Sequence, residues 1–438
     1  MHGMGRIRTD VAVALAAFAG LCIAVLTRST ALLEPDDLAY RASIVALSNG
    51  HLTLSTAEYH ALAHKLGSIA QWVQLPNGRW ISEKNPGYPF LAVPFEWIGA
   101  LRLAPLFYGG LACVGLFAGA RRWLGRFGGA WAVVLYCSSG AALVFAWRAT
   151  MPTFTDASLI AAGAGALLWT FLATDAPQGR RAVAGLLGFL ALEAATFTRY
   201  TDVVALGVAC VVAPLVARRT GLDRRALMVW GASVAAFCAL VATFDAAIYG
   251  GVFSTGYRSG EIQFAFGAIA PNLHEMPRQL VWSMPLLLLA LAAVVWIGVR
   301  IRRGLPGARR DAAVASALAA VWLGIYGLYL AYTWTTGQGA GGPGGGVSVH
   351  LIRFYVPALG AVALLAAWLV YRLPRWLPVV ALAAVVTLGG VEYPKLASGG
   401  GMPGGPHGIR GPGGFGPPGQ GPGYGGPPPG GPPPGYGP

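Results

Sequence analysis

Long apolar runs alternate with short polar segments along most of this chain. Each run covers roughly 15–24 residues, the length that crosses ~30 Å of hydrocarbon as a helix. The runs are continuous and lack the apolar–polar alternation of barrel strands. The pattern predicts an all-α integral membrane protein with about eleven transmembrane helices. We place them at Val11–Thr27, Leu103–Ala120, Phe127–Trp147, Ala157–Thr174, Ala182–Thr198, Val203–Ala217, Ala226–Tyr249, Leu280–Val299, Ala312–Tyr332, Phe354–Tyr371 and Trp376–Val391.

Composition supports this class and excludes others. Hydrophobic residues make up 55% of the chain and charged residues 11%, against about 25% charged in soluble proteins. The net charge of +14 comes from arginine clusters between apolar runs, as topology signals do. A basic patch with interleaved aromatics is missing from the sequence, so we predict no nucleic-acid partner. The five cysteines lie inside predicted spans, and we expect small buried apolar residues rather than zinc or thiol sites.

The arginine clusters predict the orientation. With the N-terminus in the cytoplasm, each inner connection is short and rich in arginine, as the positive-inside rule requires. The outer segments are longer, namely Arg28–Arg102, Gly250–Arg278 and Thr333–Arg353. We therefore predict a multi-pass protein of the inner (plasma) membrane whose chemistry lies on the extracytoplasmic face. The first run also resembles a signal peptide, but no clear small-x-small cleavage motif follows before Thr30, which favours an uncleaved helix.

Two regions follow from the same pattern. Residues 1–396 are expected to form one transmembrane domain, in which residues 28–102 make a first extracytoplasmic loop with amphipathic juxtamembrane helices. Residues 397–438 form a Gly/Pro-rich tail ending in PPPGGPPPGYGP. This tail lacks apolar periodicity and cannot offset the entropy cost of ordering, so we expect it to be disordered and extracytoplasmic.

The strongest local feature is the acidic motif Glu34-Pro-Asp-Asp-Leu-Ala-Tyr-Arg41, directly after the first span. Proline and acids in a first turn are typical of a helix start, where they complement the macrodipole. Adjacent residues on a helix point about 100° apart. Only one of Asp36 and Asp37 is therefore expected to face a given pocket.

This motif resembles that of the GT-C membrane glycosyltransferases. The pattern Pro-Asp-Asp-x-x-Tyr-Arg-Ala after the first span is most similar to the protein O-mannosyltransferase and aminoarabinose-transferase type (glycosyltransferase family 39-like). Further similar segments, in the family's order at the outer ends of spans, are Lys84–Leu91, Pro152–Asp156, Thr198–Thr201, Tyr249–Tyr257 and Arg353–Pro357. Asp37 stands where relatives often have Glu, and Asn85 where many have Pro, which leaves the substrate class open.

The resemblance implies a GT-C fold and a polyprenyl-phosphate-linked sugar as donor, with the site built from the first outer loop. It also implies an inverting transfer of a hexosyl or pentosyl group to an acceptor hydroxyl. Membrane lipids, the lipid-linked donor and a glycan, lipid or protein acceptor would be the partners. Sugar, acceptor and oligomeric state are not specified by the sequence.

The chemistry of such a transfer indicates which residues to consider. A base must take the acceptor's proton, and a positioned carboxylate contributes roughly 10²–10⁴-fold in that role; we assign it to Asp36, with Asp37 and Asp156 as further catalytic candidates. Asp156 would position the acceptor or share a divalent cation (Mg, Mn or Ca) with Asp36. Basic groups must hold the leaving phosphate, which arginine binds bidentately. The candidates are Lys84, Arg199, Arg258 and Arg353 for phosphate, and Tyr40, Tyr88, Tyr257 and Tyr355 for other parts of the pocket.

Other interpretations remain open at this point. Asp36 and Asp156 also suit helix starts, and Arg199 also suits an anchor at the membrane interface. A polytopic transporter or lipid flippase accounts for the spans, but not for the long acidic first loop. A scaffold that recruits a partner through its Gly/Pro tail is a third class.

Overall fold

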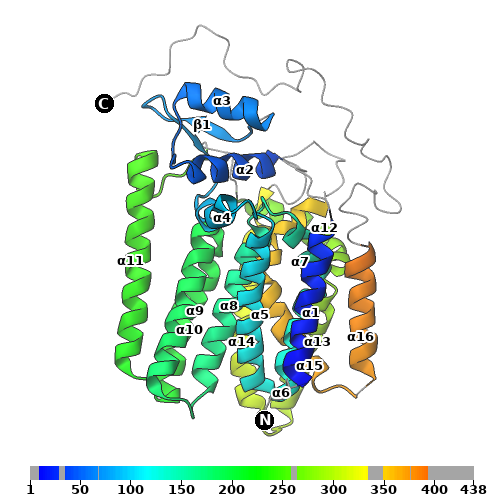
Figure 1. The fold of residues 1–438 in the computed structure, drawn as a ribbon. Coiled ribbons are helices and arrows are strands. Elements are labelled where there is room, and N and C mark those ends of the chain that lie inside the picture. Colours follow the sequence, from blue (N-terminus) through cyan, green and yellow to red (C-terminus); the bar gives the residue numbers. More distant parts are fainter. Residues whose placement is uncertain are drawn as a thin grey trace, which may run out of the picture.

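The computed structural model is a bundle of long helices capped at one end by a small mixed layer (Figure 1). It describes residues 9–28, 35–67, 69–257, 264–333, 349–374 and 376–392. The predicted tail, residues 397–438, lies outside them. The bundle helices are α1 (Thr9–Leu26), α5 (Leu103–Leu124), α6 (Arg126–Cys137), α7 (Gly140–Trp147), α8 (Thr153–Leu172), α9 (Gln178–Thr198), α10 (Val203–Thr220), α11 (Arg224–Tyr249), α13 (Leu286–Arg302), α14 (Ala308–Leu330), α15 (Leu359–Val370) and α16 (Leu377–Val385).

The all-α membrane class predicted from the sequence is confirmed, but the count of eleven spans is not. Seven described helices are long and apolar enough to cross a membrane, or eight if α6 and α7 form one span bent by 58°. The run predicted at Phe127–Trp147 breaks at Ser138-Ser139, and the predicted last two spans correspond to shorter helices. At the break the backbones touch, because a Cβ on Gly140 would lie 2.1 Å from the carbonyl oxygen of Gly389.

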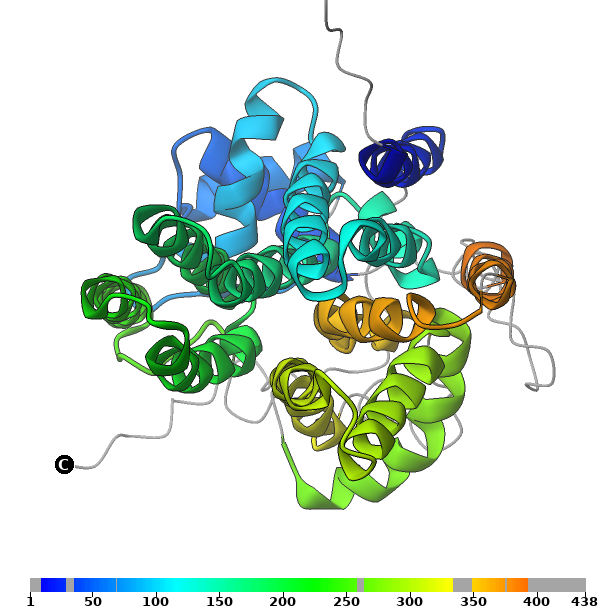
Figure 2. The same cartoon turned by 90° about the horizontal axis from the view of Figure 1, so that it is seen from below.

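Small residues bring the central helices into backbone contact. A Cβ added to Gly115 of α5 would lie 2.7 Å from the Ala162 carbonyl oxygen, and one on Gly165 of α8 would lie 2.2 Å from the Gly115 carbonyl carbon. Such close approach is how membrane helices associate where lipid supplies no hydrophobic driving force. The view along the bundle shows α11 and α16 at opposite edges, away from this pair (Figure 2). The pair α5–α8 therefore forms a closely packed centre of the bundle.

The cap is built from the first long polar segment. It holds α2 (Pro35–Ser48), α3 (Thr56–Leu66), the hairpin β1 (Trp72–Gln74) and β2 (Trp80–Ser82), and α4 (Gly87–Trp97). Helix α3 begins with a capping box between Ser55 and Glu58, and Tyr59 stacks on Trp80 with ring centroids 4.2 Å apart. Helix α2 lies across the end of the bundle (Figure 1) and buries Tyr40 and Ile44 among other apolar side chains. This end is called the capped end below.

Loops and short helices complete the capped end. They are η1 (Tyr200–Asp202), η2 (Phe266–Ala268), α12 (Ile269–Ser283), η4 (Val349–Phe354) and η5 (Val356–Ala358), while a π-helical turn, η6 (Val386–Glu392), follows α16. An isolated bridge joins Phe264 to Tyr332. The long polar segments of the chain therefore meet at the capped end of the bundle.

At the opposite end, buried acids hold the arginine-rich turns. Asp311 accepts a hydrogen bond from Trp123 Nε1 at 3.0 Å and pairs with Arg372 at 3.0 Å. Asp10 pairs with Arg126 at 3.0 Å. These contacts fasten the helix ends of α5, α14 and α15, and of α1 and α6, far from the cap.

The cysteines lie in the helices that the sequence indicated, but not all are buried. Cys113 and Cys137 are buried, with sulfurs 3.6 Å apart. Cys210 and Cys238 lie on exposed faces of α10 and α11, so the prediction of burial is wrong for them. A lipid-facing helix surface is apolar too, and hydrophobicity alone does not separate it from the core.

Candidate functional site

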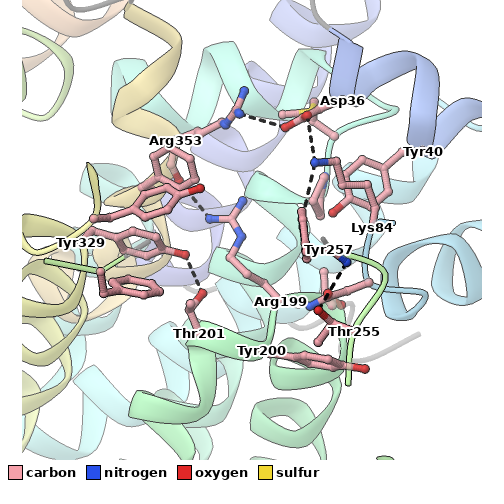
Figure 3. Close-up of a pocket in the computed structure, with 17 residues that line it drawn as sticks. Asp36, Tyr40, Lys84, Arg199, Tyr200, Thr201, Thr255, Tyr257, Tyr329 and Arg353 are labelled. Carbon is pink, nitrogen blue, oxygen red and sulfur yellow. Dashed lines mark hydrogen bonds and ion pairs between the residues drawn. The ribbon is translucent and has the colours of Figure 1, made fainter. Parts of the chain in front are cut away.

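A cavity of about 230 Å³ lies at the capped end, between the cap and the helix ends (Figure 3). Its walls come from seven places in the chain: α2, the segment after β2, the residues before α8, the α9–η1 turn, the loop after α11, the end of α14, and η4. The lining includes Asp36, Tyr40, Lys84, Asn85, Met151, Thr198, Arg199, Tyr200, Thr201, Thr255, Tyr257, Phe264, Tyr329, Tyr332, Arg353 and Phe354. Segments far apart in sequence therefore meet at one polar pocket.

Asp36 is held by two basic side chains. It lies in the first turn of α2, with Oδ1 3.3 Å from Lys84 Nζ and Oδ2 2.8 Å from Arg353 Nη2. Burial alone would raise the pKa of Asp36, but the charges of Arg353 and Lys84 outweigh it and hold the pKa well below its usual range. Asp36 is therefore ionised in the ligand-free protein.

Lys84 is enclosed between two acids and an aromatic ring. It follows β2, and its Nζ lies 3.3 Å from Glu83 Oε1 as well as from Asp36. It donates to the Tyr257 hydroxyl at 3.4 Å and lies 4.9 Å from the centre of that ring. Burial would lower the pKa of Lys84, but Asp36 and Glu83 raise it above its usual value. The ammonium is therefore charged at neutral pH.

Arg199 reaches the same cavity from the other side. It caps the C-terminus of α9, and its Nε lies 3.2 Å from Asp156 Oδ2. Nη1 donates to the Arg353 carbonyl at 3.3 Å, and Nη2 donates to Thr153 Oγ1 at 3.2 Å. Figure 3 shows Arg353 and Lys84 beside Asp36, with Arg199 farther along the cavity. Three cationic groups thus converge on one small volume.

The neighbouring acid, Asp37, faces elsewhere. It is fully buried, pairs with Arg148, and accepts a hydrogen bond from Thr150 Oγ1 at 2.8 Å. It does not line the cavity. This divergence of two adjacent side chains matches the ~100° step of a helix, and Arg148 was not singled out from the sequence.

The other sequence candidates divide into three groups. Tyr40 and Tyr257 line the cavity. Tyr88 and Tyr355 are fully buried and do not line it: Tyr88 donates to the Ala149 carbonyl, and Tyr355 packs edge-on against Tyr326. Asp156 is also fully buried and touches the cavity only through Arg199. Arg258 lies outside the described residues.

Several residues at the site gave no sequence signal. Tyr329 lies in the last turn of α14 and Tyr332 directly after the helix, where both have the pattern of ordinary interface aromatics. Tyr329 Oη lies 2.5 Å from Thr201 Oγ1. Gln71 is the one non-glycine residue with positive φ (57°) in the described parts of the chain, and its side chain hydrogen-bonds Asp36. Backbone strain of this kind, about 1–3 kcal/mol, concentrates at functional sites. Only tertiary structure reveals it.

The acidic side chains do not fit a divalent cation as they are arranged. In the described ranges, no group of three or more His, Cys, Asp or Glu is placed to hold a metal ion. The two acids expected to share one are each engaged by basic groups, Asp36 by Lys84 and Arg353 and Asp156 by Arg199. Mg²⁺ and Ca²⁺ bind through oxygen ligands, and the positive charges of these lysine and arginine side chains would repel the metal ion.

Comparison with known proteins identifies the fold. No protein-family model matches the sequence, and no curated protein matches it either. ArnT from Cupriavidus metallidurans is similar in two structures, apo and bound to undecaprenyl phosphate, at 16% and 15% identity with TM-scores of 0.52 and 0.54. The apo oligosaccharyltransferase of Archaeoglobus fulgidus matches 93% of this chain and 57% of its own length, at 12% identity and a TM-score of 0.48.

These likenesses establish the fold alone. The ArnT structures cover 86% and 88% of this chain, and the chain spans 61% and 64% of theirs, about three fifths. The chain thus has the fold of these ArnT structures, as the resemblance to the aminoarabinose-transferase type predicted.

Proposed function

We propose that this protein is an inverting membrane glycosyltransferase. It moves a hexosyl or pentosyl group from a polyprenyl-phosphate donor to an acceptor hydroxyl of a glycan, lipid or protein. The observation that carries the proposal is the cavity in which Asp36 lies among Lys84, Arg199 and Arg353. The fold it shares with ArnT, a protein seen bound to undecaprenyl phosphate, supports a lipid phosphate as the donor's carrier.

The three cations form the phosphate subsite. Arginine and lysine make charge-assisted hydrogen bonds to phosphate that are about twice as strong as neutral ones. Fixed positive groups stabilise the negative charge that develops on a leaving phosphate, at little reorganisation cost. Lys84, Arg199 and Arg353 would bind the donor and stabilise departure of polyprenyl phosphate.

Asp36 would act as the general base. The acceptor oxygen attacks the anomeric carbon and gives its proton to the Asp36 carboxylate as the bond between that carbon and the phosphate oxygen breaks. The bonding electron pair leaves with polyprenyl phosphate, and attack from the opposite side inverts the anomeric centre. Asp37 lies away from the cavity, where its pairing with Arg148 would hold the first turn of α2 in place.

Donor binding would also activate the base. Pairing with Lys84 and Arg353 lowers the pKa of Asp36, and a carboxylate with so low a pKa is a weak base. A phosphate at the subsite competes for Lys84 and Arg353, so the pKa of Asp36 rises when the donor binds. The aromatic and hydroxyl-bearing walls, including Tyr40, Tyr257 and Phe354, suit a sugar ring held by a few polar contacts.

The proposed orientation places this site outside the cytoplasm. The arginine-rich turns lie at the end opposite the cavity, where Arg126 and Arg372 pair with buried acids. The positive-inside rule puts such turns in the cytoplasm. A membrane-impermeant thiol reagent applied to intact cells tests this: a cysteine engineered on the exposed surface of α3 should be labelled, and labelling only after the membrane is permeabilised would contradict the orientation.

The test of the function uses the purified full chain in lipid nanodiscs with a panel of polyprenyl-phosphate sugars and candidate acceptors. We expect transfer from at least one donor, and a loss of roughly 10²–10⁴-fold in Asp36→Asn. Asp175→Asn is the matched control, because Asp175 is an exposed acid paired with Arg122 at the other end of the bundle. Full activity in Asp36→Asn would refute the base assignment. Lipid movement across sealed vesicles without any covalent product would support the transporter class instead.

A further inference from the structure

Asp156 is fully buried in the first turn of α8, and both of its oxygens have a neighbour. Oδ1 accepts a hydrogen bond from the Ala157 backbone N–H at 2.6 Å, and Oδ2 lies 3.2 Å from Arg199 Nε. A buried carboxylate is costly unless a charge or hydrogen bond compensates it. An acid so placed is poorly suited to bind an acceptor or a metal ion, and well suited to hold an arginine.

Arg199 is fixed at all three of its nitrogens. Besides Asp156 at Nε, the Arg353 carbonyl accepts from Nη1 and Thr153 Oγ1 accepts from Nη2. Each of the two terminal nitrogens carries two N–H groups and uses one of them in these contacts. Because Arg199 also lines the cavity, the second N–H group of each nitrogen is available for a charge-assisted hydrogen bond to a phosphate.

We propose that Asp156 is a positioning residue that holds the Arg199 guanidinium in the phosphate subsite before the donor arrives. This inference rests on the proposed function. A free arginine side chain loses much rotamer entropy on binding, so a prefixed one binds the phosphate more tightly. Asp156 itself touches neither donor nor acceptor, and Thr153, one turn earlier on α8, supplies the second fixed point.

Asp202 offers a contrast within the same small region. It follows Arg199 by three residues and is buried, yet no described basic group lies within ion-pair distance of its carboxylate. If contact with the guanidinium is what matters, then neutralising Asp156 weakens donor binding and neutralising Asp202 does not. If only the local negative charge matters, then both changes act alike.

The experiment is a double-mutant cycle on the full chain in nanodiscs, with a polyprenyl phosphate as the probe. We measure its Kd, and the KM values for donor and acceptor in the transfer assay. Asp156→Asn should raise the Kd and the donor KM by roughly 10- to 100-fold, the scale of a lost charged hydrogen bond, and leave the acceptor KM unchanged. Arg199→Gln should raise the Kd at least as much, and the combined variant should show no further loss.

Two further variants keep the proposal falsifiable. Thr153→Val removes only the Nη2 contact and should raise the Kd by a smaller factor, which provides a second route if Asp156→Asn fails to fold. Asp202→Asn should retain the Kd of the unmodified protein. Additive effects in the cycle, an equal loss in Asp202→Asn, or a loss in Asp156→Asn confined to the acceptor KM would each overturn the proposal while the transferase function stands. Absence of both lipid-phosphate binding and transfer in the unmodified protein would overturn the function as well.

Discussion

The ionisation of Asp36 gives the sharpest prediction. Arg353 lies 2.8 Å and Lys84 3.3 Å from its two oxygens, and together they lower its pKa. If Asp36 is the base, activity falls where it becomes protonated, so the acidic limb of kcat/KM reports its pKa in the free enzyme. For the unmodified protein this limb should lie below the usual carboxylate range of about 4.

The size of the effect follows from the geometry. A unit charge ~4 Å away at an effective dielectric constant of ~20 contributes about 4 kcal/mol, or about three pKa units. Arg353→Gln removes that charge while Lys84 stays, so the pKa should rise by about 1–3 units and the limb should move to higher pH. In the combined variant Lys84→Met with Arg353→Gln, only the Gln71 hydrogen bond still opposes the effect of burial, and the limb should lie above the ordinary value of about 3.9.

The assay is donor-dependent transfer in nanodiscs at pH 3–9, with each variant normalised to its own plateau; the unmodified protein should keep its plateau activity down to about pH 4. A polyprenyl phosphosugar is a phosphodiester and does not titrate in this range, so movement of the limb belongs to the protein. Arg79→Gln is the control, since Arg79 is exposed on the same cap and bonds Thr53 instead. A limb in the combined variant that coincides with that of the unmodified protein would refute Asp36 as the base.

Three predictions concern packing and stability. Gly87→Ala would place a Cβ 2.3 Å from the backbone of α9 and should destabilise the protein by about 1–3 kcal/mol, which a lower Tm would show. Gly207→Ala, whose Cβ would meet nothing within 4 Å, should leave the Tm unchanged. Gly256→Ala would meet the backbone of the first long segment at 2.5 Å, so the loop after α11 should shift and transfer should fall while Tm changes little; unchanged transfer would contradict this contact. Asp311→Asn should cost about 1–3 kcal/mol and leave the Kd for polyprenyl phosphate unaltered, whereas the exposed Asp175→Asn should change neither.

Much of the site was readable from the sequence because its residues stand at the ends of apolar runs. The step of about 100° along a helix already implied that Asp36 and Asp37 diverge, and the structure places Asp36 in the cavity and Asp37 against Arg148. Lys84, Arg199 and Arg353 meet there although the first and the last are 269 positions apart in the sequence. The sequence indicated these three residues because each stands in or beside an outer polar segment and not inside an apolar run.

The features of the fold and the site that the sequence did not predict depend on tertiary geometry. The break between α6 and α7 arises where Gly140 touches Gly389, a contact between segments that sequence spacing does not relate. Gln71 takes a backbone conformation that its residue type does not favour, and Tyr329 looks like any aromatic at a membrane boundary. Asp156 was expected to face a substrate or metal, and its place behind Arg199 became visible only with both helices assembled.

The close contact of α5 with α8 has an evolutionary consequence. Thr153 and Asp156 belong to α8, whose glycine contacts with α5 leave little room for repacking, so the groups that hold Arg199 belong to a tightly packed part of the bundle. Tyr257 and Phe264 instead come from the segments that connect α11 to η2. Under the proposed function, the part of the wall built by these connecting segments can change by loop exchange, whereas the groups that hold Arg199 cannot move without repacking α8 against α5.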